Sequence, residues 1–168
     1  EEPEGCPRFG GRVIEGIDAR RPTPAWMKAR LERAGIRSIS AVVDVTNYVM
    51  LELGQPMHAY DARHLDGALL VRFARTGETL TLLNGDVLEL EADLLLVCDE
   101  KKPLGLAGIM GGEHSGIADD TTTVYLEAAY WDPAVVQGRM RRLGFTSDAG
   151  YRFERGVDPA IGPAAIER

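Results

Sequence analysis

One of the three histidines in this sequence stands out as a residue that could orient water or act in acid–base chemistry. His58 lies in the segment QPMHAYD, where Pro56 holds the chain extended just after a predicted helix stop. We expect His58 to lie on a loop, where residues held by a rigid scaffold often bind or catalyse. His64 and His114 lie in polar stretches and are weaker candidates. A histidine that is merely hydrogen-bonded in a turn is the alternative for His58.

A glycine-rich segment, LAGIMGGEHSG, spans residues 106–116 and contains Gly108 and Gly111. Glycine allows backbone N–H groups to approach a ligand closely, such as a carbonyl, a phosphate or a developing oxyanion. The segment lacks the Gly-Lys-Ser/Thr of a P-loop and the G-x-G-x-x-G of a dinucleotide site, which excludes both. A tight turn between strands is the alternative.

Glu127 is an acidic residue inside the apolar run VYLEAAYWD. Burial of a carboxylate is costly unless a partner donates to it. If the run is a strand, Tyr125 and Glu127 share one face and Leu126 takes the other. Glu127 therefore either faces water or is a buried acceptor that needs a donor.

A small polar segment, residues 146–150, precedes the aromatic and basic sequence YRFERG. It could line a pocket and contact an RNA end, or form a helix cap with an exposed ion pair. Residues 138–155 hold five arginines against Asp148 and Glu154, a local charge of 5 − 2 = +3. This stretch could contact a phosphate or be a solvated helix face. The net charge of −7 and pI of about 5.0 make the whole chain a poor general binder of nucleic-acid backbone.

Residue types and spacing argue against several other kinds of site. Cys6 and Cys98 form no C-x-x-C pair and have no neighbouring metal ligands, as expected for reduced thiols of a cytosolic protein. The sequence offers no convincing Ser-His-Asp order, and it lacks the H-x-E and C-x-x-C of a zinc deaminase.

The length of 168 residues fits one domain, and the composition of 45% hydrophobic and 27% charged residues is typical of a soluble globular protein. No apolar run approaches the ~20 residues that a membrane span needs, and the acidic start is not a signal peptide. The chain has no initial Met and ends inside a plausible helix, so we expect a fragment of a longer protein.

Local patterns predict helices at both ends and a β region between them, an α+β arrangement. A strand is expected at residues 12–17. The helix that follows it should be capped by Thr23 and end at Gly35. Residues 41–53 are ambiguous because β-branched residues recur at helical spacing; we predict a helix, since Gly54 and Pro56 make a clear stop. The predicted strands are residues 69–73, 79–83, 87–90, 94–98, 104–110 and 124–128, with a type I′ turn at Asn84-Gly85. Further helices are expected over 133–143 and from Pro159.

Four segments occur in a fixed order: AVVDVTNYVMLELGQPMHAYD, LAGIMGGEHSGI, LEAAYWDP and YRFERGVDP. Together they resemble the central editing domain of the phenylalanyl-tRNA synthetase β subunit, bacterial type, over about residues 6–168. The resemblance implies a single editing domain over residues 1–168, mixed α+β with a β-sandwich-like centre flanked by helices. It also implies hydrolysis of tRNA mischarged with tyrosine. A non-catalytic tRNA-interaction or structural module and a free-standing trans-editing deacylase are the alternatives.

The resemblance also implies roles for individual residues. His58 would lie beside the scissile ester, while Gly108 and Gly111 would leave room for the substrate. Glu127 would recognise the tyrosine hydroxyl. The remaining substrate-binding residues would be Arg37, Thr46, Asn47, Pro56, Ser147 and Ala149. Ser147 stands where threonine is common, and Gly150 where serine is expected.

The expected partners are the 3′ end of an aminoacylated tRNA, free tyrosine, the rest of the β subunit and the α subunit, with no membrane. We expect a cytoplasmic protein whose domain holds no metal or cofactor. ATP and magnesium would act only at the synthetic site elsewhere in the enzyme.

Overall fold

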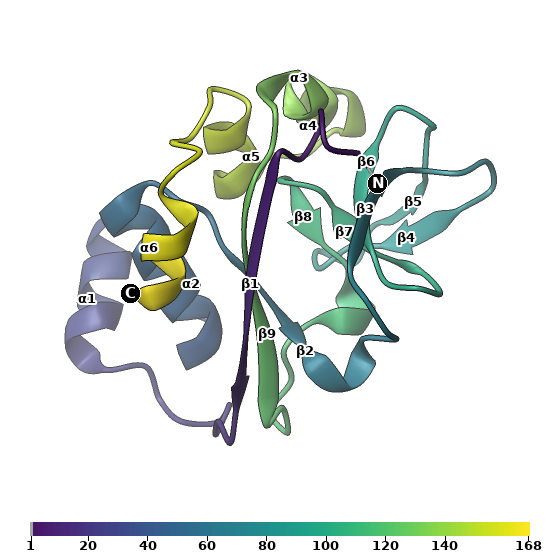
Figure 1. Ribbon diagram of the computed structural model, residues 1–168. Coiled ribbons are helices and arrows are strands. Elements are labelled where there is room, and N and C mark those ends of the chain that lie inside the picture. The colour runs from purple at the N-terminus through teal and green to yellow at the C-terminus, as the bar shows by residue number, and fades with distance from the viewer. Residues whose placement is uncertain (1) are drawn as a thin grey trace.

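A computed structural model describes residues 2–168, and a three-stranded antiparallel sheet runs through its centre (Figure 1). Its order is β1 (Arg8–Glu15), β9 (Thr123–Tyr130) and β2 (His58–Asp61). The strand predicted at residues 12–17 begins four residues earlier than expected, because the whole of β1 pairs with β9. Since β2 also pairs with β9, the central strand joins segments that lie far apart in the sequence.

A second antiparallel sheet lies beside the first and gives the centre its sandwich-like form. Its strands, in spatial order, are β3 (Leu70–Phe73), β6 (Leu95–Cys98), β7 (Pro103–Leu106) and β8 (Met110–Gly111). The predicted single strand over 104–110 is wrong. The chain reverses between β7 and β8, and Gly108 in the turn has a φ of +68°, which suits glycine.

The hairpin of β4 (Thr79–Thr81) and β5 (Val87–Glu89) is confirmed, but its turn type is not. A type I′ turn needs positive φ at two residues, and among residues 2–168 only glycines have positive φ. Gly85 has a φ of +88°, and its N–H donates to the Leu82 carbonyl. The Leu82 N–H donates to the Asp86 carbonyl, so the loop has three residues and ends in a left-handed glycine.

Two helices, α1 (Ala25–Arg33) and α2 (Ala41–Leu53), pack together on one side of the central sheet. The predicted helix over 41–53 is confirmed. Ser40 caps α2, and Gly54 ends it with a φ of +77°. The predicted cap at Thr23 is wrong: its hydroxyl donates instead to Asp44, a fully buried residue of α2.

The C-terminal region forms short helices: α3 (Pro133–Val136), α4 (Arg139–Leu143), α5 (Asp148–Phe153) and α6 (Gly162–Glu167). The helix predicted over 133–143 is therefore broken, because Gly138 between α3 and α4 has a φ of +77°. Two single turns of 3₁₀ helix complete the described elements, η1 (Ala62–His64) and η2 (Glu113–Ser115). The predicted α+β class with flanking helices is confirmed. Within residues 2–168, no helix is long and apolar enough to cross a membrane.

The two faces of the central sheet have different roles. Ala59, Val124 and Leu126 face one way and form a small apolar cluster with residues that include Val42 of α2. Strand alternation turns His58, Tyr60, Tyr125 and Glu127 to the other face, toward the second sheet and the main core.

Candidate functional site

The centre of the candidate site is a carboxylate buried between the two sheets. Glu127 is 6% exposed and lies directly opposite His58 in the pairing of β9 with β2. The hydroxyl of Tyr60 donates to Oε2 of Glu127 at 2.6 Å. Glu127 therefore does not face water: it is a buried acceptor, and its donor is Tyr60. The loop placement of His58 is wrong, because this residue begins strand β2.

Burial controls the protonation of these groups. It raises the pKa of Glu127 from 4.5 to about 7, and the hydrogen bond from Tyr60 opposes that rise. Burial, followed by the nearby Glu127 charge, raises the pKa of the Tyr60 phenol well above 10. Burial lowers the pKa of His58 to about 4, so its imidazole is neutral at pH 7.

His58 has an unused hydrogen-bonding atom. Its Nε2 is buried and has no partner within residues 2–168. The imidazole lies over Gly111, where a Cβ would come within 2.5 Å of Nε2. Only glycine at position 111 therefore leaves the ring in this place. His64 and His114 instead stack on each other at 5.1 Å.

A cavity of about 60 Å³ lies between the central sheet, the β7–β8 hairpin and α5. Five predicted site residues are among those that line it: His58, Gly108, Gly111, Glu127 and Ala149. The other lining residues are Met57, Tyr60, Val97, Gly105, Leu106, Ile109, Met110, Trp131 and Phe153.

Ser147 supports the cavity from behind. Its hydroxyl donates to the Ile109 carbonyl at 2.6 Å and accepts from the Gly150 N–H at 3.0 Å. Ser147 thus caps α5 and ties that helix to the β7–β8 turn. An ion pair between Arg152 and Asp148 accompanies the cap, as the helix-cap alternative for this segment expected.

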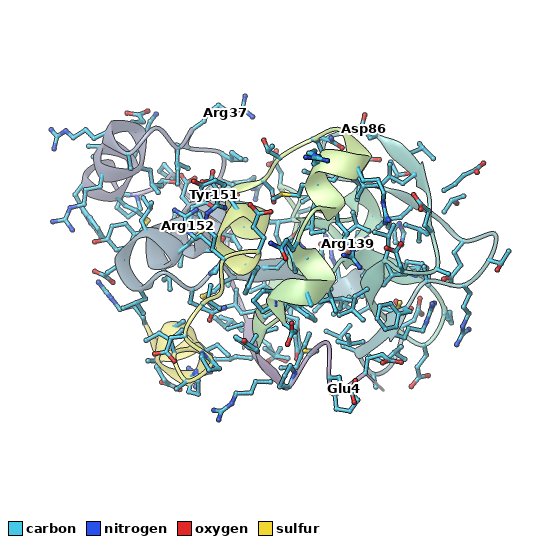
Figure 2. All side chains as sticks on the ribbon, turned by 90° about the horizontal axis from the view of Figure 1, so that it is seen from above. Glu4, Arg37, Asp86, Arg139, Tyr151 and Arg152 are labelled. Atoms are coloured by element: carbon cyan, nitrogen blue, oxygen red, sulfur yellow. The ribbon has the colours of Figure 1, made fainter. Side chains whose placement is uncertain are left out.

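Besides Ser147, four predicted site residues do not line the cavity. Arg37 follows α1 and is exposed, and Figure 2 shows it projecting from the edge of the molecule. Thr46 is buried in α2, where its hydroxyl donates to the Val43 carbonyl. Asn47 is partly buried on the same helix, and Pro56 is buried just before β2.

Internal ion pairs occupy much of the arginine-rich stretch over 138–155. Arg142 forms two hydrogen bonds with Asp93, at 2.7 and 2.9 Å, and Arg139 approaches the same carboxylate at 3.4 Å. Arg155 pairs with the adjacent Glu154 at 2.6 Å. Arg139 and Arg152 come from neighbouring helices (Figure 2). These pairs fit the alternative of a helix face with structural ion pairs.

The sequence interpretation missed Tyr60, Trp131 and Phe153. Tyr60 is two residues after His58, so a strand assignment for that segment would have placed both on one face. Trp131 and Phe153 bracket Gly108, where an added Cβ would lie 2.6 Å from Trp131 and 3.3 Å from Phe153. No local pattern marks these two aromatic residues as pocket walls.

Burial raises the pKa of the Cys6 thiol to about 12 and that of the Cys98 thiol to about 11, which makes both poor nucleophiles. In the described part of the chain, no three His, Cys, Asp or Glu side chains group together as metal ligands. A larger hollow of about 480 Å³ lies between β1, β9 and α6, and it contains none of the predicted site residues.

Comparison with known proteins agrees with the resemblance. The family model described as the B3/4 domain matches residues 5–168. Phenylalanine–tRNA ligase β subunits from Pectobacterium atrosepticum and Aromatoleum aromaticum are 55% and 57% identical over the whole chain. The chain spans 21% of the length of each of these relatives.

A solved structure shows a related fold. It is an N-terminal fragment of the phenylalanyl-tRNA synthetase β subunit from Pyrococcus horikoshii, with a TM-score of 0.56 and 13% identity. The match covers 85% of this chain and 46% of that one. With a family model that spans almost every residue, the chain belongs to the B3/4 domain family, and its resemblance to bacterial phenylalanyl-tRNA synthetase β subunits is confirmed.

Proposed function

We propose that this domain is the editing site of a phenylalanyl-tRNA synthetase and hydrolyses the ester of tRNA mischarged with tyrosine. The supporting relatives are named as phenylalanine–tRNA ligase β subunits. In this proposal the domain works with the rest of the β subunit, the α subunit and the 3′ end of the tRNA. It needs no cofactor of its own, since ATP and magnesium would act at the synthetic site.

The observation that carries the proposal is the buried carboxylate of Glu127 in a cavity shared with His58 and the glycine turn. A charged hydrogen bond from a phenol to such a carboxylate is worth roughly 1.5–3 kcal/mol. Phenylalanine has no hydroxyl and would leave the carboxylate desolvated without a second donor. Sites built around a substrate hydroxyl reject the bare analogue by about 10⁴–10⁵. In this proposal Phe-tRNA escapes hydrolysis because phenylalanine lacks the hydroxyl, and not because of its size.

One oxygen of Glu127 is available for this contact. Tyr60 donates to Oε2, whereas no side chain within residues 2–168 donates to Oε1. Glu127 itself lines the cavity, so this second oxygen can be reached from it. We assign Oε1 as the acceptor of the substrate phenol.

The cavity must widen to admit a tyrosyl group. Its volume of about 60 Å³ is far below the roughly 300 Å³ at the lower end of ligand pockets. Met57 and Met110 are among the lining residues, and unbranched methionine side chains repack readily. Movement of these two side chains would enlarge the space next to Glu127.

Hydrolysis in this proposal uses a positioned water without a covalent intermediate. The pKa of His58, about 4, is too low for an efficient general base at neutral pH. Its unpartnered Nε2 instead suits it to orient water or the terminal ribose. In the glycine turn, the N–H groups of Ile109 and Gly112 already donate to backbone carbonyls. The Gly108 N–H donates to no acceptor within residues 2–168, which makes it the candidate oxyanion donor.

The test compares hydrolysis of Tyr-tRNA and Phe-tRNA by the assembled synthetase and by its Glu127→Ala variant. Glu127→Ala should strongly reduce hydrolysis of Tyr-tRNA. Glu113→Gln, in the exposed turn η2, serves as a matched control and should keep the original activity. If Glu127→Ala left both hydrolysis and the tyrosine preference unchanged, Glu127 would have no recognition role. Absence of ester loss from the original enzyme would favour a non-catalytic module.

A second comparison addresses His58. If His58 orients, His58→Gln should keep most of the rate, because its amide can still form a hydrogen bond, whereas His58→Ala should be inactive. Equal and complete loss in both variants would contradict the orienting role and favour base catalysis.

A further inference from the structure

Glu127 already holds a phenol from its own chain. Tyr60 is 2% exposed, and its hydroxyl lies 2.6 Å from Oε2. Its ring also meets the imidazole of His58 edge to face, with ring centres 4.4 Å apart and planes at 79°. Tyr60 thus contacts both of the polar groups that the proposed editing reaction uses.

We propose that Tyr60 is a positioning and specificity residue for Glu127: it fixes Oε2 from the core side, so that Oε1 faces the cavity for the substrate phenol. This inference rests on the proposed editing function. It assigns the tyrosine preference to a pair of residues, with Tyr60 acting through Glu127.

The sheet geometry supports this role. Tyr60 pairs directly with Tyr125, and His58 pairs with Glu127, so Tyr60 and Glu127 are diagonal neighbours on one face. Diagonal neighbours in an antiparallel pair are within reach of an aromatic side chain. A glutamate has three side-chain torsions, and ordering such a side chain on binding costs free energy. The rigid ring of Tyr60 removes much of that cost before the substrate arrives.

The charges around Glu127 support it as well. The groups that interact with this carboxylate from neighbouring segments are Tyr60, Tyr125 and Cys6, and His58 lies opposite. None of them carries a charge at pH 7, since burial keeps the His58 imidazole deprotonated and the raised pKa values keep the two phenols and the thiol protonated. The Tyr60 hydroxyl is the one group in the described chain that lowers the pKa of Glu127.

Removal of this hydroxyl therefore has two expected consequences. The carboxylate becomes free to turn, and it takes up a proton at higher pH. A protonated Glu127 accepts a phenol less well and also loses less when phenylalanine leaves it without a donor. Discrimination between Tyr-tRNA and Phe-tRNA should therefore fall, because Tyr-tRNA is bound less well and Phe-tRNA is rejected less strongly.

The experiment uses Tyr60→Phe in the assembled synthetase, with kcat/KM for Tyr-tRNA and Phe-tRNA measured across neutral pH. The preference for Tyr-tRNA should fall about 10-fold or more, the loss of one hydrogen bond to a charged group. The acid limb of Tyr-tRNA hydrolysis should move to higher pH. Tyr130→Phe is the matched control, since Tyr130 also lies on β9 but on the face opposite Glu127, and both readouts should stay unchanged.

Three outcomes would overturn the inference. Tyr60→Phe could leave both the preference for Tyr-tRNA and the acid limb of its pH profile unchanged from the original enzyme. It could raise Tyr-tRNA hydrolysis, which would make Tyr60 a competitor of the substrate phenol. It could also lower hydrolysis of both substrates equally at every pH, the pattern of a merely structural role.

Two further measurements keep the inference separate from folding and from the proposed function. If Tyr60 acts through Glu127, adding Tyr60→Phe to Glu127→Gln should cause no further loss, whereas additive losses would contradict the coupling. If Tyr60→Phe does not fold, fluorotyrosine at position 60 keeps the ring and makes the hydroxyl a stronger hydrogen-bond donor. The acid limb of the pH profile for Tyr-tRNA hydrolysis should then move to lower pH, and an unchanged acid limb would contradict the inference. Failure of the original enzyme to hydrolyse Tyr-tRNA would reject the proposed function itself.

Discussion

Under the proposed function, Gly111→Ala should disable hydrolysis of Tyr-tRNA by displacing His58, while leaving the fold intact. A Cβ at position 111 would lie 2.4 Å from Cε1 and 2.5 Å from Nε2 of His58. Ordinary contacts begin at 3.4 Å, so the imidazole must retreat by 3.4 − 2.4, or about 1 Å. A displacement of about 1 Å in a catalytic group can cost on the order of 100-fold in rate, which is the loss we expect for Tyr-tRNA hydrolysis.

The stability of Gly111→Ala should change little. Gly111 does not have a positive φ, so alanine fits its backbone, and the clash involves a side chain that borders a cavity. The loss of unfolding free energy should stay at or below the roughly 1–3 kcal/mol of an overpacked core, measured by urea titration. Gly162→Ala is the control, because its Cβ would meet the nearest atom at an ordinary 3.5 Å.

Two results would refute this reasoning. One is a Gly111→Ala enzyme that hydrolyses Tyr-tRNA at the original rate. The other is a crystal structure of the Gly111→Ala protein in which the His58 imidazole has not moved, because the substitution is expected to act only by displacing that ring.

Three other predictions concern polar side chains that are buried or partly buried. Because burial raises the pKa of Glu127 from 4.5 to about 7, the folded protein keeps a proton that the unfolded chain has lost. The contribution of Glu127 to the free energy of unfolding should therefore fall as pH rises from 4.5 to about 7, whereas the lowered pKa of His58 contributes in the opposite direction up to about pH 6.5. Urea titrations of the original protein and of Glu127→Gln across this pH range isolate the Glu127 contribution as the difference between the two. Ser147→Ala should lower stability by about 1–2 kcal/mol through loss of the cap, while Ser147→Thr keeps the hydroxyl and most of that stability in thermal unfolding. Asp44→Ala should cost roughly 3 kcal/mol or more in chemical denaturation, because it removes the buried charged acceptor of three hydrogen bonds, from Thr23, Ser38 and Ile39; an unchanged midpoint would contradict that role.

Local sequence signals were sufficient where they matched the requirements of the backbone. The helix over 41–53 follows its spacing of apolar residues between Ser40 and Gly54, and both ends depend only on neighbouring residues. The same reading failed over 104–110, where a continuous apolar run hides a reversal at Gly108. It failed again at Gly138, since a glycine can break a helix without any other change in pattern.

The sequence by itself determined the α+β class, most of the strands and, through its four ordered segments, the family. It also identified Glu127 as a residue that must either meet water or find a donor, because an acidic residue in an apolar strand allows nothing else. Only the tertiary structure decided between these two outcomes. The donor, Tyr60, lies 67 residues away in the chain, and the register of two strands brings it to Glu127. Such a register depends on the packing of the whole sheet, which no short segment of sequence contains.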